Sequence, residues 1–161
     1  MGDSVSVEIV EFSSGKDVNT ALAAGSIDFG LEGSCPASLA IAQDLGVELI
    51  WIHEVLGDVE SLVATNTSGI NSVADLKGKK VAVPFASTAH FSLLKAMENA
   101  GLSASDVTVL DMQPDKIYAS WNSGDIDAAY IWEPTLSQLS NKKTVITSGE
   151  LAKAGYMTSK C

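Results

Sequence analysis

Two short turns in this sequence place small residues and hydroxyl groups where a helix is expected to begin. The first contains Ser34 and Cys35 between a glycine and Pro36, and the second contains Ser87 and Thr88 after a proline. The exposed N–H groups of a helix start attract an anion without any charged side chain. The two turns therefore predict an anion site. The alternative, that they are ordinary helix caps that Ser and Thr provide for stability alone, stays open.

A third group of side chains could bind a cation. Tyr130, Trp132 and Glu133 lie at the end of an expected strand, where aromatic faces attract an ammonium and a neighbouring carboxylate would hold it. The alternative is that Tyr130 and Trp132 share the core side of the strand while Glu133 is solvated. His90, three positions into its helix, could donate to an anion or pack beside Phe91.

Few features of the sequence would support catalysis. It contains no Gly-x-Ser-x-Gly elbow, no phosphate-binding loop and no dinucleotide fingerprint. His53 and His90 are isolated, and no Cys or His pair has the spacing of metal ligands. Cys35 and Cys161 lie far apart, which argues against a disulfide framework. We therefore predict a binding protein rather than an enzyme, with no cofactor and no metal.

The charge balance excludes several classes of partner. Of 161 residues, 20 are acidic and 10 are basic, so the net charge is -10, and all the basic residues are lysine. Such a chain repels a polyanion, which excludes nucleic-acid binding, and it has no arginine fork for a carboxylate or phosphate. The 46% of hydrophobic residues suffices for a core, but no apolar stretch reaches the ~20 residues of a membrane helix. Residues 1–6 lack the features of an export signal.

Alternating strands and helices must position these residues. Alternating or β-branched apolar runs predict strands, and apolar residues three or four apart predict helices that end at glycine. In the first half we expect strands over 5–9, 27–31, 47–55 and 61–65, and helices over 16–25 and 36–46. In the second half we expect strands over 81–83, 107–110 and 126–132, and helices over 72–78, from 87 to 101, from 114 and from 134. This order predicts an α/β fold with parallel strands joined by helical crossovers.

One pattern occurs twice along the chain. Segments 24–28 and 123–127 each end a helix at a glycine and begin a strand, which then leads to a turn and a helix started by proline. The repeat indicates two similar lobes that face each other, or only the junction that many α/β proteins share. The polar stretch at 66–71 is the expected boundary between the lobes.

The residues in and around these turns carry a family resemblance. The matching segments are 12–15, 21–25, 27–30, 33–34, Pro36, 56–57, Glu60, 76–94, 113–114, Trp121, 124–127 and 129–134. Over roughly residues 7–155, the chain resembles the taurine-binding members of the periplasmic solute-binding proteins of ABC importers, in the sulfonate, nitrate and taurine group.

The resemblance implies a type II periplasmic-binding-protein-like fold, α/β with parallel-rich sheets. Its two lobes would close over a small anion or taurine-like zwitterion by hinge motion and hand it to an ABC permease. The residues then expected to bind the solute are Ser34, Cys35, Ser87, Thr88 and His90 for the sulfonate, Glu133, Tyr130 and Trp132 for the amine, and Ser13, Ser14 and Glu60 from the other matching segments. Cys35 is a weaker donor than the small hydroxyl residue that relatives more often have.

The length departs from this family, whose members are considerably longer. We expect residues 1–66 to form a partial lobe one, without its first strand and C-terminal return, and residues 67–161 to form a nearly complete lobe two. Open strand edges favour pairing, so we expect a homo-oligomer. The resemblance implies a periplasmic location, whereas a natural full-length chain without an export signal would be cytoplasmic. The alternative is a truncated remnant without a working transport site that self-associates or binds a partner.

Overall fold

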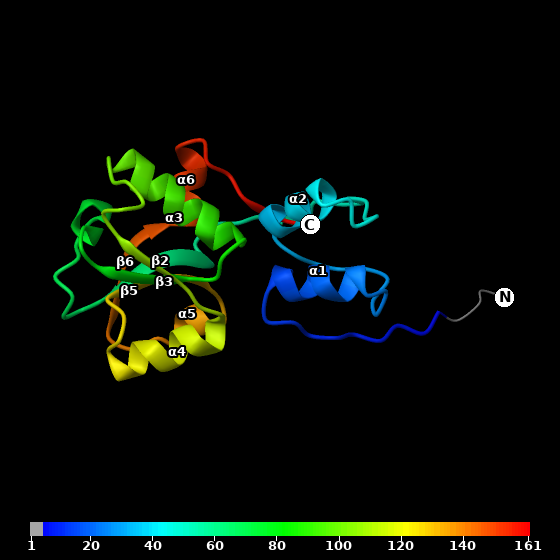
Figure 1. The fold of residues 1–161 in the computed structure, drawn as a ribbon, viewed down its shortest axis with the longest axis horizontal. Helices are drawn as coiled ribbons and strands as arrows, with labels where there is room; N and C mark the ends of the chain where they lie inside the picture. Colours follow the sequence, from blue (N-terminus) through cyan, green and yellow to red (C-terminus); the bar gives the residue numbers. More distant parts are fainter. Residues whose placement is uncertain (1–4) are drawn as a thin grey trace.

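A computed structural model describes residues 5–161 and arranges them in two bodies of unequal size (Figure 1). The larger body, about residues 57–157, holds a five-stranded sheet between two layers of helices. The smaller body, residues 5–56 with 158–161, holds two helices and long stretches without regular structure. No helix in the described part of the chain combines the length and the apolar character needed to cross a membrane.

The sheet of the larger body is mixed. Its strands are, in spatial order, β4 (Thr108–Asp111), β3 (Lys80–Val83), β5 (Ala128–Trp132), β2 (Glu60–Thr65) and β6 (Lys142–Thr147). β3 pairs in parallel with β4 and β5, whereas β2 runs antiparallel to β5 and β6. The α/β class is therefore confirmed, but the expectation of parallel strands holds only where a helix crosses between them. β2 enters the sheet without a preceding crossover helix, so its direction is not constrained in this way.

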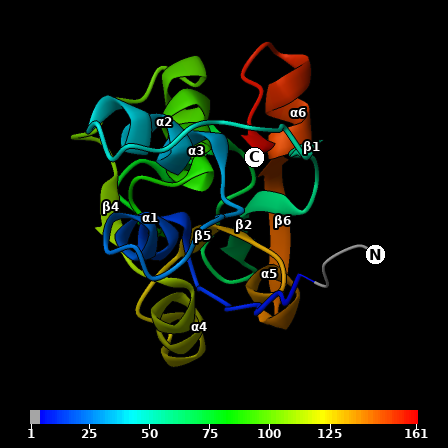
Figure 2. The same cartoon turned by 90° about the vertical axis from the view of Figure 1, so that its right-hand side faces the viewer.

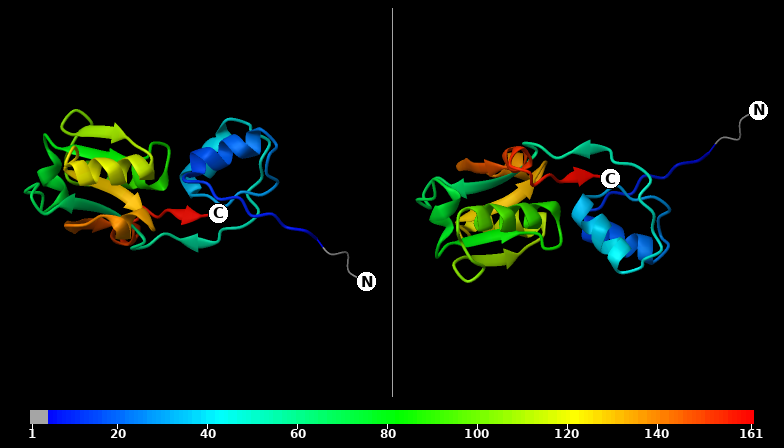
Figure 3. Two further views of the ribbon diagram at one scale, coloured as in Figure 1. Left: turned by 90° about the horizontal axis from the view of Figure 1, so that it is seen from below. Right: turned by 90° about the horizontal axis from the view of Figure 1, so that it is seen from above.

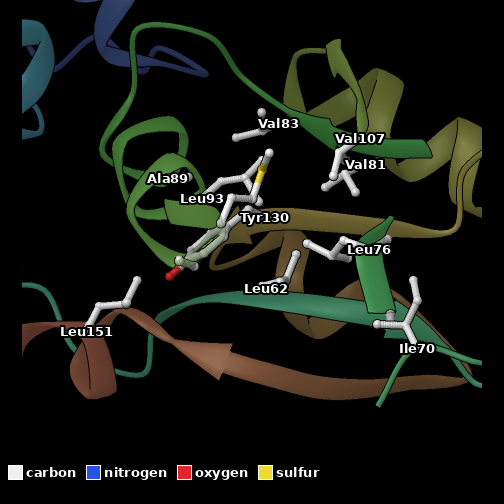
Figure 4. Close-up of a cluster of buried hydrophobic side chains, with 14 residues drawn as sticks. Leu62, Ile70, Leu76, Val81, Val83, Ala89, Leu93, Val107, Tyr130 and Leu151 are labelled. Carbon is white, nitrogen blue, oxygen red and sulfur yellow. The ribbon is translucent and has the colours of Figure 1, made fainter. Parts of the chain in front are cut away.

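Helices cover both faces of this sheet (Figure 1). One face carries α3 (Thr88–Asn99) and α6 (Ser148–Lys153), and the other carries α4 (Pro114–Ser123) and α5 (Thr135–Gln138). The side chains of β5 alternate between the two cores. Tyr130 lies in the cluster beneath α3, with Leu62 and Leu93 (Figure 4), while Ile131 lies in the cluster beneath α4. This period of two is what a strand buried on both faces requires.

Local signals set the ends of these helices. Ser87 caps α3 and accepts a hydrogen bond from the His90 N–H at 3.1 Å. α4 begins at Pro114 and ends at Gly124, whose φ of 78° suits glycine. The short helix expected over 72–78 is a 3-10 helix, η1 (Val73–Leu76). β6 and α6 were not predicted. Five residues of the strand are half-buried and Thr144 is exposed, so the strand shows no regular alternation.

The smaller body forms its helices but lacks most of its expected strands. α1 (Gly15–Ala23) and α2 (Ser34–Ala42) confirm the two helices. The strands expected over 5–9 and 27–31 are absent, and of 47–55 only β1 (Glu54–Val55) forms. Those predictions were wrong because a strand needs a neighbour for its N–H and C=O groups, and the described residues provide none there. Trp51, for example, is 68% exposed instead of buried.

Two extended segments join the bodies. β1 pairs antiparallel with β7 (Ser159–Lys160), and the Leu56 N–H donates to the Thr158 carbonyl at 2.8 Å (Figure 3). The expected boundary at residue 66 does not coincide with an edge of the larger body, because β2 precedes it and lies between β5 and β6. We propose instead that the bodies divide where the chain crosses at about residues 57 and 157.

Candidate functional site

A cleft of about 530 Å³ opens between the two bodies. Several elements contribute their starts or ends to its lining, among them the beginnings of α1, α2 and α3 and the end of β5. Figure 2 shows α1 and α2 in front of the larger body, and residues at the start of both helices line the cleft. Several helix N-termini facing one cavity make it suited to an anionic group.

Glu60 lies at the base of this cleft and is almost fully buried, with 1% of its surface exposed. Its carboxylate accepts hydrogen bonds from Thr88 Oγ1 at 2.5 Å, Ser148 Oγ at 2.7 Å and Ser92 Oγ at 3.5 Å. Burial raises the pKa of Glu60, and the three hydroxyls oppose that shift. The network continues to the Tyr130 hydroxyl, 3.0 Å from Ser148 Oγ. Glu60 therefore ties β2, α3 and α6 together beneath the cleft.

Glycine allows the two bodies to meet closely above Glu60. A Cβ on Gly33 would lie 2.7 Å from Thr88 Cγ2, so the start of α2 packs directly on the start of α3. A Cβ on Gly15 would lie 2.5 Å from Pro36 Cγ, so α1 and α2 meet just as closely. Side chains at these two glycines would separate the three helix starts that line the cleft.

Two of the five residues expected at the anion, Ser87 and Thr88, line the cleft, together with Ser13 and Ser14 from the other matching segments. Their hydroxyl protons already have acceptors. Ser13 and Ser14 donate to Asp17 at 2.9 and 3.0 Å, Ser87 donates to the Pro84 carbonyl at 2.6 Å, and Thr88 donates to Glu60. The donors that remain are backbone N–H groups of the first helical turns. The His90 N–H is not among them, because it donates to Ser87 Oγ.

The other three residues expected at the anion do not line the cleft. Ser34 Oγ accepts a hydrogen bond from the Ser159 N–H at 3.2 Å and so fastens β7 to α2. Cys35 is half-buried, and burial with nearby Glu60 raises the pKa of its thiol to about 11. The His90 ring stacks on Phe85 with centroids 4.3 Å apart, and burial lowers its pKa. His90 is thus packed against an aromatic ring, but that ring is Phe85 and not the Phe91 of its alternative interpretation.

The residues expected at the amine are also divided. Trp132 and Glu133 line the cleft, but Tyr130 has no exposed surface and belongs to the core (Figure 4). The burial of Tyr130 favours the alternative in which it is a core side chain. The exposed Glu133 carboxylate accepts bonds from the Ser137 N–H at 2.9 Å and Ser137 Oγ at 2.7 Å, so it also stabilises the start of α5.

Sequence reasoning missed several residues of the site. Ser92 lies one turn after Thr88 on the same face of α3, a spacing that could have identified it. Ser148 belongs to a helix that was not predicted, so no signal pointed to it. Glu32 and Lys160 also line the cleft, and Lys160 Nζ lies 3.5 Å from Glu54 Oε1. Lys160 reaches the site only because β7 pairs with β1.

Neither a metal nor a disulfide is indicated in the described part of the chain. No group of three or more His, Cys, Asp or Glu side chains among residues 5–161 has the arrangement of a metal site. Cys35 and Cys161 are both free thiols. The site therefore consists of backbone amides, hydroxyls, carboxylates and one lysine.

Comparison with known proteins assigns the family. The sequence profile described as "NMT1/THI5 like" matches residues 3–158. The chain belongs to this family. The taurine-binding periplasmic protein of Escherichia coli K12 is 39% identical over 140 residues, which cover 87% of this chain and 43% of that protein. A putative aliphatic sulfonates-binding protein of Bacillus subtilis is 34% identical over 92% of this chain and 45% of its own length. The chain thus spans less than half the length of these curated relatives.

Solved structures agree with this membership. The alkanesulfonate-binding protein SsuA of Xanthomonas axonopodis pv. citri, bound to MOPS, matches with a TM-score of 0.76 and 30% identity over 93% of this chain and 53% of that chain. SsuA of Escherichia coli matches with a TM-score of 0.72, 29% identity, and coverage of 94% and 52%. The fold is therefore that of periplasmic binding proteins. The desulfurization enzyme DSZB matches at 16% identity with a TM-score of 0.52 over 68% of this chain and 47% of its own, which shows a shared fold alone.

Proposed function

We propose that this chain is the solute-binding part of an ABC importer and holds a small sulfonate, or a similar anion or zwitterion, in the cleft. The observation that carries the proposal is the convergence of three helix starts on one cavity between two bodies joined by paired extended segments. Two such bodies can close over a solute by bending at the segments that connect them. The membership of the family and the names of the relatives support the same function.

The anionic end of the solute would lie at the helix starts. The chain has no arginine, and the hydroxyls of Ser87 and Thr88 already have acceptors, so backbone N–H groups would carry most of the hydrogen bonding. Helix N-termini suit this task because their N–H groups and their dipoles favour negative charge. The amine of a zwitterion would face a cleft carboxylate, for which the sequence suggested Glu133 beside Trp132.

The partner and the location follow from the same proposal. A solute-binding part needs a permease to receive its cargo, and the taurine-binding relative is named as a periplasmic protein. We therefore propose an ABC permease as the partner and the periplasm as the location. No catalytic step is proposed, because the relatives named above are binding proteins.

A second candidate function rests on the smaller body. Its apolar side chains are widely exposed, among them Ile9 at 92%, Phe29 at 79% and Ile50 at 75%. Phe29 and Ile50 line one hollow, and contiguous apolar surface often marks an interface. In this alternative the chain does not bind a solute, and a second copy covers the exposed surface to give a homo-oligomer.

Calorimetric titration distinguishes the two functions. The chain is titrated with taurine, ethanesulfonate, sulfate and nitrate, and the transport proposal expects saturable heat from at least one sulfonate. The substitution Ser87→Ala should weaken that binding, because it loosens the start of α3. Ser38→Ala is the matched control, since its exposed hydroxyl donates only to the Ser34 carbonyl within α2. Heat from none of the four ligands would reject solute binding and favour the second candidate.

A further inference from the structure

Carboxylates outnumber cations in the cleft. Lys160 provides the lining's lone ammonium group, and it is already paired with Glu54 at 3.5 Å. The lining carboxylates are those of Glu11, Glu32, Glu54, Glu60 and Glu133. A solute that is only an anion would meet net repulsion here, whereas a solute with a positive group of its own would not.

One of these carboxylates differs from the rest. Glu60 accepts hydrogen bonds from hydroxyl groups, and Glu133 accepts one from the Ser137 N–H. Glu54 forms an ion pair with Lys160, and Glu11 is exposed to solvent. Glu32 is only 9% exposed, and its Oε2 atom is buried without a hydrogen-bond partner among residues 5–161. Leaving a buried polar oxygen unpaired costs free energy, so such an atom indicates a missing partner.

Backbone hydrogen bonds fix Glu32 in the wall of the cleft. Its N–H donates to the Cys161 carbonyl, and the Cys161 N–H donates back, both at 2.8 Å. Its Oε2 atom lies 3.1 Å from the position that a Cβ on Gly15 would occupy, at the very start of α1. Burial raises the pKa of Glu32 to about 7, because no positive group stabilises its charge. A solute cation would supply that group.

We propose that Glu32 selects solutes that carry an ammonium group, with Oε2 accepting hydrogen bonds from the amine. The preferred solute class is then an aminosulfonate or a related zwitterion, rather than a plain alkanesulfonate or an inorganic anion. This inference rests on the proposed function and assigns the amine to Glu32 instead of Glu133. Glu133 fits the amine less well because it is exposed and its two oxygens already stabilise α5.

The test compares two ligands that differ only in the amine. Taurine and ethanesulfonate are titrated calorimetrically at pH 8, above the pKa of Glu32. The wild-type chain should bind taurine more tightly than ethanesulfonate. The isosteric substitution Glu32→Gln should weaken taurine binding about 10- to 100-fold, the range expected for a charge-assisted hydrogen bond, and leave ethanesulfonate binding unchanged or tighter. Glu32→Met is the second variant, and it should show the same loss of preference.

A control variant separates this effect from a general change in charge. Glu8→Gln removes the same charge from an exposed position outside the cleft and should alter neither affinity. If Glu32→Gln retains the wild-type ratio of taurine to ethanesulfonate affinity, or if wild type binds both equally, the inference is overturned while sulfonate binding stands. If wild type binds neither ligand nor any other sulfonate, the proposed function fails and the inference with it.

Discussion

The two bodies of this molecule show what a strand pattern needs in order to become a strand. In the larger body, β2, β3 and β5 have neighbours on both sides, and their apolar residues are buried in two cores. In the smaller body, residues 47–53 have an equally apolar sequence, yet they form no strand and stay exposed. The difference shows that pairing and covering layers, rather than apolar sequence alone, decide the outcome.

Matched leucine truncations test this comparison with the largest expected effect. Leu62 has no exposed surface and lies in the core of the larger body, whereas Leu49 is 53% exposed in the smaller one. Leu62→Ala should lower the free energy of unfolding by about 2–5 kcal/mol, because it leaves a cavity. Leu49→Ala should change it by about 0.5 kcal/mol or less. Urea unfolding of both variants measures the two values.

The leucine comparison would fail in one specific way. If Leu49→Ala lowers the free energy of unfolding as much as Leu62→Ala does, another surface must cover the exposed side of the smaller body in solution. Light scattering on the same samples would then show a mass above the 16.8 kDa of one chain. That result would favour the self-associating candidate function.

The two buried glutamates predict a smaller effect that depends on pH. Burial raises the pKa of Glu32 from 4.5 to about 7, so the folded chain holds this proton more tightly than the unfolded chain. Stability should therefore fall as pH rises from about 4.5 to about 7, by on the order of 1–3 kcal/mol for this group. Burial also raises the pKa of Glu60, so this group too should make the chain less stable as the pH rises.

Glu32→Gln isolates the part of this fall that belongs to the smaller body. The variant keeps Glu60 but cannot ionise at position 32, so its stability should fall less than that of wild type between pH 5 and pH 8. Urea unfolding at the two pH values measures the difference. Parallel pH profiles for the two proteins would show that the carboxylate of Glu32 is not desolvated in solution.

Helix caps predict the smallest effect. Ser87 caps α3 through its side chain, whereas Ser14 occupies the equivalent position of α1 and makes no side-chain cap. Ser87→Ala should cost about 1 kcal/mol, and Ser14→Ala only a few tenths, because its hydroxyl instead donates to Asp17. Thermal unfolding of both variants measures the two losses of stability. A larger loss for Ser14→Ala than for Ser87→Ala would contradict the prediction.

Much of the fold could be predicted from local signals. Pro114, Gly124 and Ser87 mark helix ends by their own chemistry, so α3 and α4 were expected close to their observed bounds. Strand pairing could not be predicted in the same way, because it depends on which segments lie beside each other. That is why the antiparallel direction of β2 and the pairing of β1 with β7 were missed.

The site was predictable in outline and not in detail. The turns at Ser34 and Ser87 were recognised as helix starts, and both elements reach the cleft, the first through Gly33 and Pro36 and the second through Ser87 itself. For Tyr130 and His90 two placements stayed open, because the sequence cannot show which face of an element a neighbouring layer covers. Glu32 gave no sequence signal, since its burial arises only when Cys161, far away in the chain, pairs with it.

The pairing of β1 with β7 has a consequence for how the chain could be divided. Residues 57–157 leave the smaller body and return to it at adjacent points, joined by the bond between Leu56 and Thr158. The larger body is thus an insertion whose two ends lie together, the arrangement in which a segment can be excised and still fold alone. The smaller body, by contrast, is discontinuous, and it depends on the insertion to bring its two pieces into register.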